Sequence, residues 1–166
     1  MTASDPEAPF RQTGWPGLRA RLFHLLFLMR RPVTLGVRAL IHDRAAGSVL
    51  LIRHTYVPGW QLPGGGVEVG ETARHALERE LAEECEIALT GPAELRSVHF
   101  NRLSSRRDHV LFYLVTDFRA LKPKMPDHEI AEAGFFRLDR LPDNTTPATR
   151  RRLAEVFEGV EVSKYW

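Results

Sequence analysis

The chain has 166 residues, of which 43% are hydrophobic and 27% charged, and its formal net charge is +2. This length fits one domain with a substantial core, and the nearly balanced charge excludes a protein whose overall field attracts nucleic acid. The single cysteine, Cys85, excludes an intrachain disulfide, so we expect a buried thiol in a protein of the reducing cytoplasm.

The N-terminal residues differ in composition from the rest. Residues 1–16 are rich in proline and poor in large apolar side chains, and we predict a loose arm without a secretory pattern. Residues 17–31 are predicted to form a basic amphipathic helix with Leu18, Leu22 and Leu25 on its apolar face. Its apolar stretch is too short to cross a membrane. We expect this helix to pack on the domain or on a second subunit, and contact with an acidic membrane surface is the alternative.

Residues 32–159 have the pattern of one domain in which strands and helices are interspersed. The hydrophobic pattern predicts strands at 33–41, 48–52, 94–103, 110–118 and 135–138. A C-terminal helix is predicted at 147–157. Residues 160–166 form a tail whose Tyr165 and Trp166 could pack on a neighbour. Strands interspersed with two or more helices indicate an α/β architecture.

A further helix is predicted from Thr72 to Ile87, directly after a glycine-rich turn at 64–66. Thr72 is a suitable N-cap, and an apolar residue recurs every fourth position as one stripe. The members of the stripe are Ala73, Leu77, Leu81 and Cys85. Glycine allows the backbone before this helix to turn sharply or to approach a ligand closely.

Three glutamates of this helix lie on or beside the apolar stripe. At about 100° per residue, Glu84 lies about 20° from Leu77, and Glu80 and Glu83 follow at about 60° and 120°. A solvated face is the usual explanation of an acidic helix, but it fails for Glu84 because the stripe faces the core. Carboxylates held beside apolar surface need a cationic partner, either an arginine or a metal. For three carboxylates a metal is the simpler partner.

These residues and their spacing resemble the Nudix box, G-x5-E-x7-R-E-U-x-E-E-x-G-U, in which U is a bulky aliphatic residue. The matching positions are Gly65, Glu71, Arg79, Glu80, Leu81, Glu83, Glu84 and Ile87. Glu86 departs from the pattern, because it stands in place of the last glycine. A left-handed residue just past a helix costs a non-glycine about 1 kcal/mol, so the departure concerns the helix end more than the metal site.

The resemblance implies a Nudix-type α/β/α sandwich with a mixed central sheet over residues 32–159. It also implies a hydrolase in which water attacks a phosphorus of a nucleoside diphosphate linked to another moiety, assisted by Mg²⁺ or alternatively Mn²⁺. The metal ligands that it implies are Glu80, Glu84, Glu83 and the Gly64 carbonyl. Glu71 and Arg79 would orient the loop and the carboxylates through an ion pair.

The general base stays open between a box glutamate, Glu80 or Glu83, and an acid of a later loop. Residues 126–136 resemble the loop that precedes the late strand of the family, where a glutamate can act as the base. Glu129 and Glu132 are the candidates in this stretch.

Substrate contacts are weakly encoded. Several basic residues could bind phosphate, namely Arg53, His54, Arg102, Arg106, Arg107 and His109. Trp60, Tyr56 or Phe100 could stack on a base, although packing in the core is the usual role of an isolated aromatic residue. Residues 100–108 lack the proline or tyrosine that relatives selective for ADP-ribose or dinucleoside polyphosphates often carry there, which argues against both substrates.

Two alternatives to an enzyme stay open. One is a non-catalytic Nudix-fold sensor that binds a nucleotide, and the other is a protein that binds a membrane or a partner through residues 17–31. The unbroken set of box carboxylates favours the enzyme. Hydrolysis of RNA 5′ ends is a variant of the enzyme, and no other nucleic-acid partner is expected. A homodimer is a further expectation, given the spare apolar helix and the aromatic tail.

Overall fold

The computed structural model describes residues 23, 26–27 and 32–166. The predicted arm at 1–16 lies outside the described residues, as does most of the predicted helix at 17–31. Residues 33–166 form one unit by their contacts. Within the described part of the chain, no helix has the length and apolar character needed to cross a bilayer.

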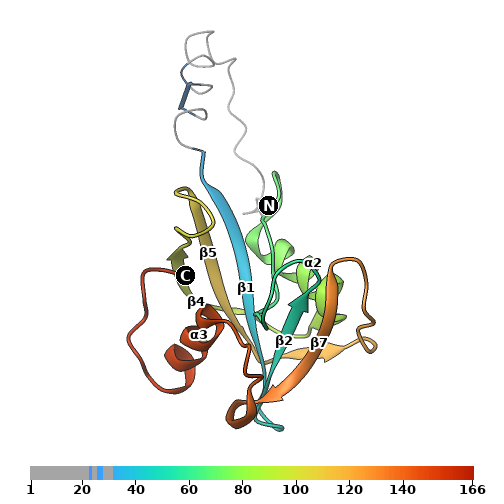
Figure 1. Ribbon diagram of the computed structural model, residues 1–166. Helices are drawn as coiled ribbons and strands as arrows, with labels where there is room; N and C mark the ends of the chain where they lie inside the picture. The colour runs from blue at the N-terminus through green and yellow to red at the C-terminus, as the bar shows by residue number, and fades with distance from the viewer. Residues whose placement is uncertain (1–22, 24–25, 28–31) are drawn as a thin grey trace, which may run out of the picture. The chain divides into compact units, whose positions relative to one another are not determined.

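A five-stranded sheet in the order β4-β5-β1-β2-β7 forms the centre of this unit (Figure 1). Strands β1 and β5 are parallel, and the other neighbouring pairs are antiparallel. The strands are β1 Thr34–Asp43, β2 Ser48–His54, β4 Glu94–Phe100, β5 Asp108–Val115 and β7 Ile130–Arg137. The parallel pair makes the sheet mixed, as predicted.

Helices α2 (Ala73–Cys85) and α3 (Pro147–Phe157) lie on opposite sides of the sheet (Figure 1). Side chains along a strand alternate between its two faces, and β1 follows this rule. Val37 and Ile41 belong to the apolar cluster that holds α2, whereas Leu40 belongs to the cluster that holds α3. Two cores on two faces confirm the predicted α/β/α sandwich.

The glycine-rich segment at 61–67 is built into the sheet. Strands β1 and β2 pair at their hairpin end, and farther along this segment lies between them. The Val37 and Ala39 N–H groups donate to the carbonyls of Gly65 and Pro63, each at 2.9 Å. On its other side the segment pairs with β2. Main-chain hydrogen bonds on both sides therefore fix its position.

Gly64 shows why this segment needs glycine. Its φ angle is +133°, and a Cβ atom there would lie 2.1 Å from the carbonyl oxygen of Val37. No other residue could occupy the position without moving the backbone.

Several predicted boundaries are wrong. The strand predicted at 94–103 ends at Phe100, and the strand predicted at 110–118 runs from Asp108 to Val115, so Phe118 belongs to a separate strand. The helix predicted to reach Ile87 ends at Cys85, because Glu86 adopts the left-handed conformation (φ 55°, ψ 41°). Residue 87 instead begins β3 (Ile87–Leu89), which pairs with β6 (Phe118–Ala120). The late strand predicted at 135–138 begins at Ile130, because its first residues pair with the end of β2. Cys85 is free and buried, as predicted.

Residues 163–166 run beside β4 rather than away from the domain. The Phe100 N–H donates to the Lys164 carbonyl at 2.9 Å, and the Trp166 N–H donates to the Phe100 carbonyl at 3.2 Å. The Trp166 indole packs against the core cluster around α3. The aromatic residues of the predicted tail are therefore held by their own domain.

A buried polar network fastens this tail to α3. Arg152 is fully buried and pairs with Glu155 at 2.5 Å. The Glu155 carboxylate also accepts the Ser163 N–H at 2.9 Å. The Arg152 guanidinium lies against the His99 ring, and burial together with this charge lowers the pKa of His99 to about 4. The imidazole is therefore neutral, which avoids two buried cations in contact.

Glu86→Gly tests the helix end. Because Glu86 is left-handed, glycine should raise the free energy of unfolding by about 1 kcal/mol. The exposed ion pair of Glu86 with Lys122 that is lost contributes little. Ala82→Gly is the matched control, and there glycine should cost about 1 kcal/mol because the residue is helical. Urea denaturation of both variants measures the difference, and an unchanged or lower stability of Glu86→Gly would contradict the assignment.

Candidate active site

Helix α2 directs two carboxylates at the glycine-rich segment. Glu84 is 4% exposed, and its Oε2 accepts the Gly64 N–H at 2.6 Å. Glu80 lies one turn earlier, against Gly65, where a Cβ atom would lie 2.3 Å from Glu80 Oε1. The missing side chain at Gly65 therefore lets the carboxylate approach the backbone.

Arg79 ties the helix to the loop that precedes it. Its guanidinium pairs with both oxygens of Glu71 at 3.1 Å, donates to Glu80 at 2.7 Å and donates to the Gly66 carbonyl at 3.0 Å. The predicted ion pair with Glu71 is present. Glu83 is only loosely held, 3.4 Å from Arg79 with its side chain 63% exposed. Arg79 therefore fixes the orientation of Glu80 far more than that of Glu83.

A cavity of about 330 Å³ opens beside these carboxylates. Arg38, His54, Tyr56, Val57, Gln61, Gly64, Gly65, Gly66, Glu80, Glu84 and Glu129 line it. One ligand atom each of His54, Glu84 and Glu129 lies within 4.8 Å of the others. The Tyr56 hydroxyl donates to Glu129 Oε1 at 3.1 Å. The cavity is therefore lined by residues from α2, β1, β2 and the loop before β7.

The structure separates the two late-loop candidates. Glu129 lines the cavity, whereas Glu132 lies within β7, is 55% exposed and pairs with Arg53 at 3.1 Å. Arg53 is therefore engaged away from the cavity. Glu83 is not among the residues that line the cavity either.

The other predicted substrate contacts have different surroundings. None of the three arginines of the 102–107 loop lines the cavity, and Arg102 instead stacks on Tyr165 with its guanidinium 4.3 Å from the ring centroid. Trp60 is buried in the core and packs edge-on against Phe136. Tyr56 is exposed and lines the cavity, whereas neither Trp60 nor Phe100 is among the residues that line it, so of the three aromatic candidates Tyr56 can meet a ligand there.

Sequence reasoning missed Arg38. It lies on β1, donates to the Leu62 carbonyl at 3.0 Å and faces the cavity. The available signal was one arginine inside an otherwise apolar strand. His54 was expected to bind phosphate, but its Nε2 lies 3.8 Å from Glu84 Oε1. The structure thus places the Arg38 guanidinium in the same cavity as the carboxylates, and the His54 imidazole next to Glu84.

The electrostatics of the cavity favour a bound cation. Burial raises the pKa of the Glu84 carboxyl to about 8, although the Arg38 charge opposes the shift. Burial also raises the pKa of Glu80, and the hydrogen bond from Arg79 opposes it. Among the described residues, no lysine or arginine nitrogen lies within 4.0 Å of the Glu84 carboxylate. Buried carboxylate oxygens without a close counter-charge suit a divalent metal ion, which prefers oxygen ligands.

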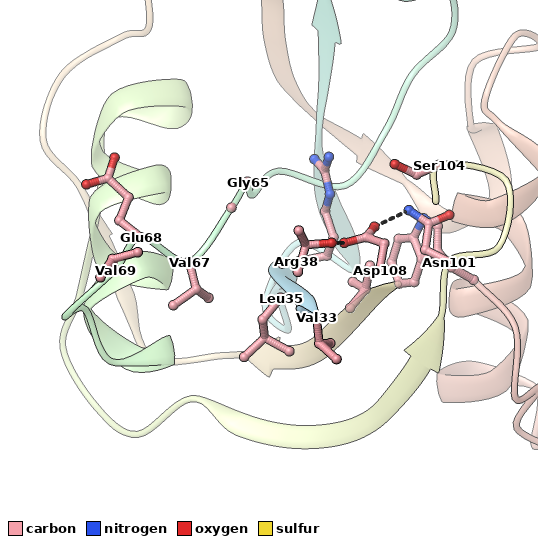
Figure 2. Close-up of a pocket in the computed structure, with 15 residues that line it drawn as sticks. Val33, Leu35, Arg38, Gly65, Val67, Glu68, Val69, Asn101, Ser104 and Asp108 are labelled. Atoms are coloured by element: carbon pink, nitrogen blue, oxygen red, sulfur yellow. Dashed lines mark hydrogen bonds between the residues drawn. The ribbon is translucent and has the colours of Figure 1, made fainter. Parts of the chain in front are cut away.

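A second pocket of about 560 Å³ adjoins the cavity and shares Arg38, Gly65 and Gly66 with it (Figure 2). Apolar side chains form part of its lining, namely Val33, Leu35, Val67, Val69, Val110 and Trp166. Asp108 is one of its polar residues, together with Thr34, Arg38, Glu68, Asn101 and Ser104. The Asp108 carboxylate accepts from Thr34 Oγ1 and from Asn101 Nδ2, each at 2.8 Å.

The family model of the NUDIX domain matches residues 32–157. The chain belongs to the Nudix family. The resemblance of the box is therefore confirmed, and its glycine-rich start, its helix and its carboxylates are the elements that build the cavity. The Nudix relatives differ in what they act on, so the family does not by itself identify the substrate.

Two relatives illustrate this range. A Mycobacterium tuberculosis protein provisionally named mutator protein MutT4 is 34% identical over 101 residues, which are 60% of this chain and 41% of that protein. The NAD-capped RNA hydrolase NudC of Pectobacterium atrosepticum is 30% identical over 115 residues, which are 68% of this chain and 43% of that protein. The chain thus spans less than half the length of either relative.

Among solved structures, the MutT NUDIX hydrolase from Burkholderia pseudomallei is similar over most of its length. Its identity to this chain is 33% and its TM-score 0.63, with 74% of this chain and 97% of that chain covered. The fold of this Nudix domain is therefore shared with a hydrolase of nearly the same extent.

The raised pKa of Glu84 predicts a pH dependence of metal-free stability. The carboxyl holds its proton more tightly in the folded state than at its ordinary pKa of 4.5. As pH rises from about 4.5 to 8, the unfolded state ionises first, and the free energy of unfolding falls. Glu84→Gln removes this loss, because glutamine stays neutral and can still accept the Gly64 N–H.

We therefore expect metal-free Glu84→Gln to exceed the wild type by at least about 1 kcal/mol near pH 8 and by little near pH 4. Chemical denaturation with a chelator present, at several pH values, measures the difference. Glu161→Gln, at an exposed position, is the control and should show no such trend. A difference between Glu84→Gln and wild type that does not change with pH would contradict the burial of an ionisable carboxyl.

Proposed function

We propose that the protein is a divalent-metal-dependent Nudix hydrolase that cleaves a diphosphate linkage of a nucleotide derivative by attack of water on phosphorus. The observation that carries this proposal is the buried Glu84 carboxylate, which has no close cation among the described residues and shares one cavity with Glu80 and the exposed Glu129, beside a pocket large enough for a nucleoside. Mg²⁺ is the expected metal and Mn²⁺ the alternative. A broken set of box carboxylates would favour a non-catalytic sensor, and the set here is complete.

Glu80 and Glu84 would hold the metal, with the Gly64 carbonyl as a further ligand. A bound divalent ion would neutralise the diphosphate and acidify the attacking water. Arg79 keeps the Glu80 carboxylate in place, and Glu71 anchors Arg79 to the loop. Glu83 lies at the exposed rim, so its predicted role as a ligand requires its side chain to turn toward the cavity.

Glu129 is the general base that the geometry supports best. It lines the cavity opposite the α2 carboxylates, and the Tyr56 hydroxyl orients its carboxylate. A proton acceptor so placed can take a proton from the attacking water. Arg38 would bind a phosphate oxygen, because a guanidinium donates charge-assisted hydrogen bonds to phosphate.

The adjoining pocket would receive the nucleoside part of the substrate. Its volume lies within the range of about 300–1,000 Å³ that is usual for small-molecule sites. The apolar lining suits a base, and Asp108 offers acceptors to its N–H groups. An RNA 5′ end is the alternative substrate, supported by the likeness to an NAD-capped RNA hydrolase.

Three expectations from the sequence remain predictions. They are a cytoplasmic location, a homodimer and contact of residues 17–31 with a partner or a membrane surface.

The proposal is tested by product release from a panel of nucleoside diphosphate derivatives, nucleoside triphosphates and capped or triphosphorylated RNA, with and without Mg²⁺. We expect metal-dependent turnover of one group, and a loss of about 10²-fold or more in Glu84→Gln, because a metal ligand is removed. Absence of turnover by a folded protein across the panel would favour the sensor. Near-wild-type activity of Glu84→Gln would contradict the metal assignment.

Glu129→Gln and Glu132→Gln form a matched pair. The first should lower kcat by about 10²-fold or more, because a general base commonly contributes that much. The second should stay within about threefold of the wild type, since an exposed ion pair contributes little. Steady-state kinetics of both variants decides between them. Equal effects of the two substitutions would indicate that the general base is a glutamate of the Nudix box.

A further inference from the structure

His54 lies at the centre of the carboxylate cluster although nothing in the box pattern places it there. It is the last residue of β2 and is 7% exposed. Its Nε2 is 3.8 Å from Glu84 Oε1, which is too long for a hydrogen bond. Two ligands that each lie about 2.1 Å from one ion are about 3 to 4.2 Å apart. The spacing therefore suits two ligands of one metal.

The contacts of the imidazole hold the ring in place. Burial lowers the pKa of His54, and the Arg38 charge lowers it further. Its Nδ1 is buried and has no well-aligned hydrogen-bond partner among the described residues. The Glu129 main chain faces the ring, and Tyr56 packs against it at 5.1 Å between ring centroids. These neighbours leave little freedom to the ring.

Other roles fit these contacts less well. An ion pair with Glu84 is weakly supported, because the 3.8 Å between Nε2 and Oε1 is too long for a hydrogen bond. A core histidine would be expected to satisfy its ring nitrogens with hydrogen bonds, and His54 lines the cavity instead. A phosphate contact is disfavoured, because the carboxylates of Glu84 and Glu129 lie beside the ring and repel an anion.

We propose that His54 supplies a nitrogen ligand, through Nε2, to the divalent ion held by Glu84. This inference rests on the metal site of the proposed function and adds a ligand of a different kind. Imidazole is a typical ligand of transition metals, whereas Mg²⁺ prefers oxygen. Mn²⁺ is the transition metal of the two expected ions, so it tolerates a nitrogen ligand better than Mg²⁺ does, although its usual ligands are also oxygens. The site should therefore bind Mn²⁺ in preference to Mg²⁺, even where either ion supports hydrolysis.

Pulsed electron paramagnetic resonance of one equivalent of Mn²⁺ bound to the untagged full chain tests the ligand directly. The wild type should show ¹⁴N coupling to the ion, which changes to the ¹⁵N pattern when histidine is ¹⁵N-labelled. His54→Gln should lose the coupling. His75→Gln, at an exposed position on α2, should retain it. Bound Mn²⁺ without nitrogen coupling in the wild type would overturn the proposal whether or not the variant folds.

Competition titrations give the second readout. His54→Gln should weaken Mn²⁺ binding at least about tenfold and Mg²⁺ binding by less than about threefold. An unchanged ratio of the two affinities, or no Mn²⁺ binding by the wild type, would overturn the proposal. Parallel hydrolysis assays separate the two inferences. Turnover without nitrogen coupling would support the proposed hydrolase and exclude His54 as a ligand. Coupling without turnover would support His54 as a ligand and contradict the proposed hydrolase.

Discussion

The hydrogen bond from the Gly64 N–H to the buried Glu84 carboxylate joins the sheet to the helix of the Nudix box. It forms because main-chain hydrogen bonds hold residues 61–67 between β1 and β2, and because only glycine at position 64 fits against the Val37 carbonyl. With the backbone fixed on one side, the carboxylate cannot turn to water. Its raised pKa therefore follows from the position of the strand segment and from the apolar stripe of α2, rather than from any special property of the glutamate.

The box divides its charged residues between stability and chemistry. Arg79 is nearly saturated by Glu71, Glu80 and a main-chain carbonyl, so its charge is balanced by neighbouring carboxylates and this part of the box is rigid. Glu84 is left without a cation in contact, which costs stability in the absence of metal. A fully paired cluster would be more stable but would have no affinity left for an ion. The lack of a cation in contact with Glu84 is therefore what leaves the site able to bind a metal ion.

Much of the site could be predicted because the box is local in sequence. Helical geometry alone placed Glu84 inward, and the resemblance supplied the partner of Arg79. Arg38, His54 and the choice of Glu129 over Glu132 could not be predicted in this way. Each depends on which strands pair and in which register, since one step along β7 moves a side chain to the other face. The early start of β7 was hidden by its alanines and glycine, which have low β-propensity.

The tail adds a constraint that no local pattern carries. Arg152 and Glu155 are buried charges whose main effect is to hold residues 163–166 against β4, and this places the Trp166 indole in the lining of the second pocket. Arg38 lies at the junction of that pocket with the carboxylate cavity. A nucleotide bound with its base beside Trp166 would bring its phosphates past Arg38 to the carboxylates. The sheet thus sets the distance between the second pocket and the carboxylates. Arg38 lies on β1, Trp166 is hydrogen-bonded to β4, and Glu84 is bound to the glycine-rich segment that pairs with β1 and β2.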